Sequence, residues 1–228
     1  MEQEPKNERE ALWQAKVRRF DTDAAEINRG IAKLGIPFEL DQLAAVQEPY
    51  PEAIPLLLEH LEKKHSDDVM ESMMRALRIP YGGRAVFDGV YRFLRRYRDE
   101  GSTPSTKRMS SHLAYTIGNT LAVVAEKSCM PALENVVADS RNGDARLLPL
   151  HRLAKWKSPA AVELAKRMLE QDDMSWYALR ALRYAKVRDA AALARPYLAH
   201  ENSAYRTEAR RYFAMLEKPP TPPRPKRP

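Results

Sequence analysis

The sequence predicts an all-α protein, built as an α-solenoid of about five helix pairs. The composition is rich in Ala, Leu, Arg, Glu and Lys, with only 8 Gly among 228 residues, which favours helix. Apolar residues recur with the period of amphipathic helices, and a two-helix unit repeats in the second half of the chain. Because one helix pair cannot bury its apolar face alone, successive pairs are expected to stack on a continuous core.

The repeat appears when the sequence is aligned with itself. A shift of 29 residues places "ELAKRMLEQD" (163–172) on "ALARPYLAHE" (192–201), and a shift of 31 places Ala178 on Ala209. A period near 30 residues with two helices per unit is typical of an α-solenoid. The segment "KVRD" (186–189) is then the turn between the second helix of one unit and the first helix of the next.

Caps and breakers define the elements of the first half of the chain. Pro37 ends the opening helical segment, Ser66 or Asp67 is a suitable N-cap, and Pro80 stops the helix that follows. The methionines of "MESMMRAL" (70–77) recur at helical spacing, so we expect them in the core. The helices expected here span residues 7–20, 22–34, 50–65, 66–80, 84–100 and 107–127.

The second half is expected to contain three consecutive helix pairs. The loop "RNG" and the turn "KVRD" separate runs rich in Ala, Leu and Arg. The expected helices span residues 130–140, 144–156, 158–171, 173–186, 187–200 and 201–216. We therefore divide the chain into an N-terminal helical cap (1–45), the repeat array (46–216) and a tail (217–228). The tail contains "KPPTPPRPKRP", which fits neither a helix nor a sheet interior and is expected to be a disordered, extended basic arm.

Charge is distributed unevenly along the chain. Residues 1–144 carry 20 Lys+Arg and 23 Asp+Glu, whereas residues 145–228 carry 18 and 8. The basic second half predicts an acidic partner, either protein or nucleic acid; the alternative is a solvated basic surface with a basic tail. No apolar run approaches the roughly 20 residues that span a bilayer, and no secretory signal is evident, so no membrane partner is expected. The single cysteine, Cys129, cannot form an internal disulfide, which favours a cytoplasmic setting.

Two stretches carry a resemblance to a known family. "YPEAIPLLLEHL" and the run from "YTIGNTLAVVA" through "VVADSRNGDARLLPLHRLAKWKSPAAV" resemble bacterial HEAT-repeat proteins with short repeats of the bilin-lyase type. The resemblance covers roughly residues 46–216. It implies a right-handed α-solenoid of HEAT-like pairs that acts as a curved scaffold and binds other macromolecules, rather than an assigned reaction.

Enzymatic relatives of this repeat type fit the sequence less well. Bilin lyases share the repeat, but no bilin pocket is marked here. The HEAT-like alkylpurine DNA glycosylases carry a Trp-Trp-Asp motif, whereas the tryptophans of this chain, Trp13, Trp156 and Trp176, are all separate. A DNA-repair role and a bilin-lyase-like role therefore remain secondary alternatives.

A basic and aromatic stripe is the candidate binding site. Within 174–186, Trp176, Arg180 and Arg183 lie on the face opposite the apolar one. Arginine binds carboxylate or phosphate through two hydrogen bonds, and tryptophan supplies a large contact area. The alternative is that the tryptophans pack between units and the arginines only solvate the surface. The expected partner-binding residues are Arg152, Trp156, Trp176, Arg180, Arg183 and Arg211.

The sequence offers no convincing catalytic or metal site. His60 and His65 are five residues apart and would not share a helix face well, so no zinc site is expected. Ser111 and His112 are adjacent and would point in different directions on a helix. Cys129 is expected to be a small buried side chain, and no glycine-rich phosphate loop occurs. We expect no catalytic residue, no cofactor and no small-molecule substrate.

These observations predict a non-enzymatic scaffold of the bacterial cytoplasm. We expect it to dock an acidic protein partner on the basic concave face of its C-terminal repeats, as an adaptor or a toxin-neutralising protein would. The alternative is a nucleic-acid-binding HEAT-like protein, including one with a DNA-repair role. A bilin-lyase-like subunit is the third candidate.

Overall fold

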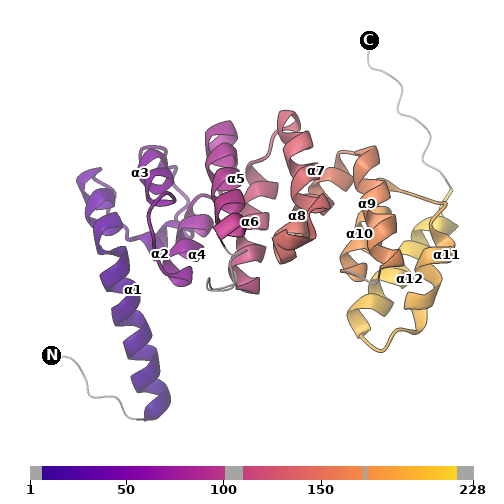
Figure 1. Ribbon diagram of the computed structural model, residues 1–228, viewed down its shortest axis with the longest axis horizontal. Helices are drawn as coiled ribbons and strands as arrows, with labels where there is room; N and C mark the ends of the chain where they lie inside the picture. Colours follow the sequence, from indigo (N-terminus) through magenta and orange to yellow (C-terminus); the bar gives the residue numbers. More distant parts are fainter. Residues whose placement is uncertain (1–6, 101–109, 172–173, 220–228) are drawn as a thin grey trace.

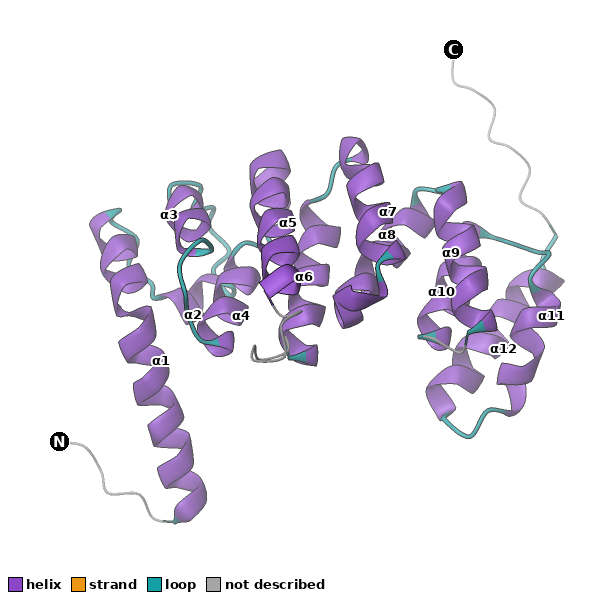
Figure 2. Ribbon diagram, viewed as in Figure 1, coloured by secondary structure: helices purple, strands orange, loops and turns teal. Residues whose placement is uncertain are grey.

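A computed structural model describes residues 7–100, 110–171 and 174–219. Within these residues the regular elements are all helices, joined by short loops, and no strand occurs (Figure 2). The prediction of an all-α protein is confirmed.

The described residues up to 124 form α-helices, several of them short. They are α1 (Glu8–Lys33), α2 (Leu40–Leu43), α3 (Ala53–His60), α4 (Asp67–Ala76), α5 (Gly83–Glu100) and α6 (Ser111–Val124). The helices of the described second half are α7 (Met130–Ala138), α8 (Leu147–Lys155), α9 (Pro159–Glu170), α10 (Ser175–Ala185), α11 (Ala191–Ala194) and α12 (Ser203–Glu217). Short 3-10 segments lie between some of them: η1 (Pro80–Gly82), η2 (Lys127–Cys129), η3 (Ser140–Arg146) and η4 (Arg195–Ala199).

The first helix is longer than the sequence predicted. The expected break between 7–20 and 22–34 was wrong, because α1 is continuous across it. No glycine or proline interrupts the chain there, and the Thr22 hydroxyl donates to the Arg18 carbonyl at 2.8 Å, a bond made within the helix. The N-terminal half of α1 extends beyond the neighbouring helices (Figure 1).

The helices follow one another along the long axis of the molecule (Figure 1). The even-numbered helices form one continuous series of contacts, since α4 packs on α6, α6 on α8, α8 on α10 and α10 on α12. On the other side, α3 contacts α5, η3 contacts α5 and α7, and α7 and α11 both contact α9. Within consecutive pairs, α5 contacts α6, α7 contacts α8 and α9 contacts α10.

One hydrophobic core runs through these contacts. Its buried residues extend from Ala24 in α1 to Tyr212 in α12. Met70, Met73 and Met74 are at most 3% exposed, so the prediction that they belong to the core is confirmed. Continuous burial of this kind is the main stabilising contribution available to short helices, which are marginal alone.

A glycine allows the closest approach between two elements. A Cβ atom at Gly118 of α6 would lie 2.4 Å from the carbonyl oxygen of Ala145 in η3, well inside van der Waals contact. The absence of a side chain at Gly118 therefore lets η3 pack directly on α6.

The turn predicted at "KVRD" is confirmed. α10 ends at Ala185, and Lys186 adopts the left-handed conformation with φ 59°. The next helix is shorter than the predicted 187–200, because α11 covers only four residues before Pro196 lies in the 3-10 segment η4. α12 ends at Glu217, and most of the predicted tail, from residue 220 onward, lies outside the described residues.

Candidate functional site: an arginine and aromatic row on α8, α10 and α12

Helix α10 presents two different faces. Ala178, Ala181 and Leu182 are buried against the core, whereas Trp176 and Arg180 are half-buried on another face. Spacings of three and four residues place side chains on one side of a helix, which explains the separation. We use the name arginine–aromatic row for the following residues of α8, α10 and α12 together with the C-cap of α8: Arg152, Lys155, Trp156, Trp176, Arg180, Arg183, Tyr184 and Arg211.

A buried carboxylate organises three arginines of the row. Glu208 of α12 has a side chain only 2% exposed. Arg180 donates to its Oε1 from Nε at 3.2 Å and from Nη2 at 2.8 Å. Arg183 Nη2 donates to Oε2 at 3.4 Å, and Arg211 Nη1 donates to Oε1 at 2.8 Å. Three guanidinium groups from two helices therefore converge on one carboxylate.

The charge of Glu208 is stabilised by these arginines. Burial opposes ionisation of this carboxyl, but the hydrogen bonds from Arg180 and Arg211 and the charge of Arg183 outweigh burial and lower its pKa below the ordinary value. The cluster thus contains three cations and one anion at neutral pH. Its net charge is positive even though every guanidinium in it contacts the carboxylate.

Aromatic rings hold the cations in place. The Cζ atom of Arg180 lies 4.8 Å from the ring centroid of Trp176, and that of Arg183 lies 4.8 Å from the ring centroid of Tyr184. The Nζ atom of Lys155 lies 5.1 Å from the same Tyr184 ring. Cation–π contacts of this kind restrict a long side chain without neutralising its charge.

Arg152 and Trp156 form a similar pair on α8. The Arg152 Cζ atom lies 4.8 Å from the Trp156 ring centroid, and its Nη2 donates to the Ala125 carbonyl at 3.1 Å. Trp156 is half-buried and packs against the hydrophobic core. The Arg152–Trp156 pair therefore serves partly in packing. This agrees with the alternative interpretation, in which the tryptophans pack between units.

A neutral histidine lies beside the row. The ring of His151 stacks on Tyr177 with centroids 5.1 Å apart, and Nε2 lies 3.3 Å from the Tyr177 carbonyl, to which it donates. Burial, and then the charge of Arg180, lower the pKa of His151 to about 4. His151 is consequently uncharged at neutral pH and supports the aromatic surface instead of adding to its charge.

The structure brings together part of the predicted stripe. Arg180, Arg183 and Arg211 meet at one carboxylate, and Trp176 stacks with Arg180. Arg152 and Trp156 form their own pair on the neighbouring helix α8.

Sequence reasoning missed Glu208, which is the centre of the site. A signal was present, because Glu208 lies three residues after Tyr205 and four before Tyr212, on the buried side of α12. A carboxylate at such a position requires cationic partners when it is buried. It also missed Lys155, Tyr177, Tyr184 and His151, whose contributions depend on contacts between helices.

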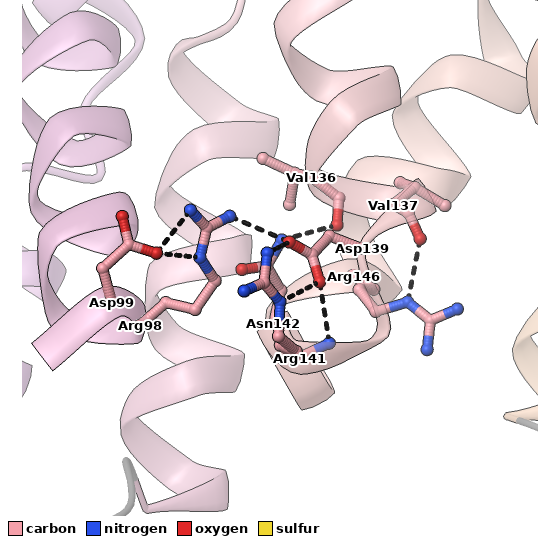
Figure 3. A network of polar contacts seen from close by, with 8 residues as sticks. All are labelled: Arg98, Asp99, Val136, Val137, Asp139, Arg141, Asn142 and Arg146. Atoms are coloured by element: carbon pink, nitrogen blue, oxygen red, sulfur yellow. Dashed lines mark hydrogen bonds and ion pairs between the residues drawn. The ribbon is translucent and has the colours of Figure 1, made fainter. Parts of the chain in front are cut away.

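A second polar network stabilises the connection between α7 and α8 (Figure 3). Asp139 accepts from Arg141 Nη2 at 2.7 Å and from Arg98 Nη1 at 2.9 Å, and the hydrogen bond from Arg141 is the largest of the effects that lower its pKa. Asn142 Nδ2 donates to the Val136 carbonyl at 2.9 Å. These groups bond to one another and to the backbone, so we interpret this network as structural.

Two histidines that the sequence treated as separate are in contact. Because α3 ends at His60 and the chain then turns, the two rings meet although they do not lie on one helix face. His60 Nδ1 lies 3.1 Å from His65 Nε2, and His65 Nδ1 lies 2.8 Å from Asp23 Oδ1. Asp23 Oδ2 also accepts from the Ser66 backbone N–H at 2.7 Å. This cluster joins α1 to the segment between α3 and α4.

Two features are absent from the described parts of the chain. No group of His, Cys, Asp and Glu there is arranged to hold a metal ion. None of the helices in those parts combines the length and the apolar character that crossing a bilayer requires. Comparisons of the chain with protein-family models, with curated proteins and with solved structures found no match.

Proposed function

We propose that this chain is a non-enzymatic scaffold that docks an acidic protein surface on its arginine–aromatic row. In this proposal the helix pairs form a right-handed α-solenoid of HEAT-like units, and the row lies on its concave face. An adaptor or a toxin-neutralising protein of the bacterial cytoplasm would have this property.

One observation carries the proposal. The row contains five cations, whereas among the described residues Glu208 is the one carboxylate that its arginines contact. Fixed guanidinium groups over aromatic rings lose little conformational entropy when they bind a carboxylate. Arginine, tryptophan and tyrosine are also the residues that contribute most to protein–protein binding.

Backbone-directed nucleic-acid binding is the second candidate, because guanidinium groups also bind phosphate. The two candidates differ in their response to salt. Nucleic-acid affinity falls linearly and steeply on a plot of log affinity against log salt, because counterions are released. A protein scaffold should have little affinity for generic duplex DNA at physiological salt.

The test is a binding titration with two labelled probes, a polyglutamate peptide and a duplex DNA of random sequence. The variant Lys155→Ala/Arg211→Ala removes two cations of the row and leaves Arg180 and Arg183 on Glu208. We expect it to weaken polyglutamate binding about tenfold, because exposed ion pairs contribute up to about 1 kcal/mol each.

The matched control is Lys157→Ala/Arg210→Ala. It changes the net charge equally at neighbouring exposed positions that are not in the row. Equal loss of affinity in both variants would contradict docking on the row. Tighter binding to duplex DNA than to polyglutamate at physiological salt would favour the second candidate.

A further inference from the structure

An open groove lies alongside the N-terminal half of α1, at the opposite end of the molecule from the arginine–aromatic row. Leu12 and Trp13 in this part of α1 are 66% and 64% exposed. The groove has a volume of about 910 Å³, and Trp13, Val17 and Phe20 supply its apolar surface. Large exposed apolar side chains beside a groove indicate a surface that another macromolecule covers.

The charges of this groove define the partner. Among the described residues, the lysine and arginine that line it are Lys16 and Arg75, which pair with Asp68 and Glu71 of α4 respectively. His112 also lines the groove and contacts Glu71. The carboxylates that line it are Asp21, Asp41, Asp67, Asp68 and Glu71. Among the described lining residues the carboxylates therefore outnumber the lysine and arginine side chains, which favours a cationic partner with apolar surface.

Two of the carboxylates are directed to water. Asp21 and Asp41 are exposed, and neither forms an ion pair with another described residue. Their charge is thus available to a partner at low ionic strength, and salt should screen it.

We infer that a second copy of this chain fills the groove with its own arginine–aromatic row. The even-numbered helices connect the two surfaces. The acidic groove with exposed Trp13 lies at one end of this series of helices, and the cations stacked on aromatic rings lie at the other end. In this dimer a two-fold axis relates the two copies, so that each groove lies opposite the other copy's row. The contact is then made twice and closes a dimer.

This inference rests on the proposed function, because the groove of one copy is the acidic protein surface that the row of the other copy binds. It names the partner and adds a second binding surface to the chain. Opposite charges on facing surfaces mainly control specificity and the rate of association. Apolar contact of Trp13 with the rings of the row supplies binding energy that salt does not screen.

The test measures the mass of the full chain in solution by sedimentation and light scattering, with two charge-reversed variants. Asp21→Lys/Asp41→Lys makes the groove basic. Arg152→Glu/Lys155→Glu/Arg211→Glu makes the row acidic, because two arginines then remain with four carboxylates, Glu208 included. The wild type should dimerise at low salt and dissociate as salt rises. Each variant alone should be monomeric, since both of its contacts join like charges, and an equimolar mixture should recover the dimer mass.

Control variants carry the same charge changes at other exposed positions. Glu48→Lys/Glu52→Lys and Lys157→Glu/Arg195→Glu/Arg210→Glu should dimerise as the wild type does. Circular dichroism of each variant checks that its helices are intact. Because the Trp13 side chain is exposed, Trp13→Ala should keep the helicity of the chain. It should raise the dissociation constant of the dimer at least about fivefold. This variant tests the inference even if a charge reversal unfolds the chain.

Three results would overturn the inference: a wild type that stays monomeric at low salt, a mixture of the two reversed variants that stays monomeric, or a mixture that forms particles larger than a dimer. A monomeric wild type that binds polylysine through the groove would assign the groove to a foreign cationic partner. If that monomer still bound polyglutamate through the row, the proposed function would stand without the dimer.

Discussion

The substitution Glu208→Gln removes the charge shared by three arginines while keeping the size of the side chain. The Glu208 side chain is 2% exposed, and those of Arg180, Arg183 and Arg211 are 27%, 25% and 58% exposed. Removal of one partner from a fully buried ion pair costs about 3–5 kcal/mol. Water reaches all three arginines here and reduces that cost, so we expect a loss of about 2–3 kcal/mol.

Urea denaturation followed by circular dichroism and by tryptophan fluorescence measures this loss. Trp176, one of the three tryptophans, stacks with Arg180, so the change in emission on unfolding includes a signal from the cluster. The loss corresponds to a decrease in melting temperature of roughly 4–12 °C for a chain of this size. Glu217→Gln is the matched control, because Glu217 lies on the same helix, is exposed and forms no ion pair with any residue of the described chain.

The pH dependence gives a second check on the same substitution. Since the folded-state pKa of Glu208 is lowered from 4.5, its stabilising contribution is present above that value and is lost as the pH falls through the folded-state pKa. The stabilities of wild type and Glu208→Gln should therefore converge as the pH falls from 4.5 through the lowered folded-state pKa. Equal urea midpoints for Glu208→Gln and Glu217→Gln at neutral pH would refute the argument that Glu208 anchors the row.

Three further substitutions test other parts of the structure. The pKa of His151 is about 4 in the folded protein and 6.5 when the side chain is unperturbed, so the free energy of unfolding should fall by roughly 3 kcal/mol as the pH drops through this interval. In His151→Phe the urea midpoint should change less over the same interval. Curves of urea midpoint against pH that run parallel for variant and wild type would contradict this argument. Gly118→Ala puts a Cβ atom 2.4 Å from the Ala145 carbonyl oxygen and should lower the free energy of unfolding by about 1–3 kcal/mol. The urea midpoint should fall accordingly, and an unchanged midpoint would contradict the close approach of η3 to α6. Arg180→Lys keeps the charge but loses the planar contact with Trp176. We expect tryptophan emission to change and the free energy of unfolding to fall by about 1 kcal/mol. An unaltered emission spectrum would count against the stacking.

Local signals in the sequence predicted most of the helices. The turn after Ala185 follows from "KVRD", and the positions of Met70, Met73 and Met74 in the core follow from helical periodicity. The continuity of α1 was missed because polar residues near Thr22 resembled a boundary, although nothing there prevents helix.

The centre of the candidate site was harder to predict, because it depends on packing between helices. Arg180 and Glu208 are 28 residues apart, and only the stacking of α10 on α12 brings them together. The contact between His60 and His65 required knowing where α3 ends. Helical periodicity identifies which side of a helix carries a residue, but it does not identify the partner on the neighbouring helix.

The most direct test of the central claim is the affinity of wild type, Lys155→Ala/Arg211→Ala and Lys157→Ala/Arg210→Ala for labelled polyglutamate at physiological salt. If the row is the docking surface, only the first variant should lose affinity, by about tenfold. Indistinguishable affinities for the two variants would contradict the claim.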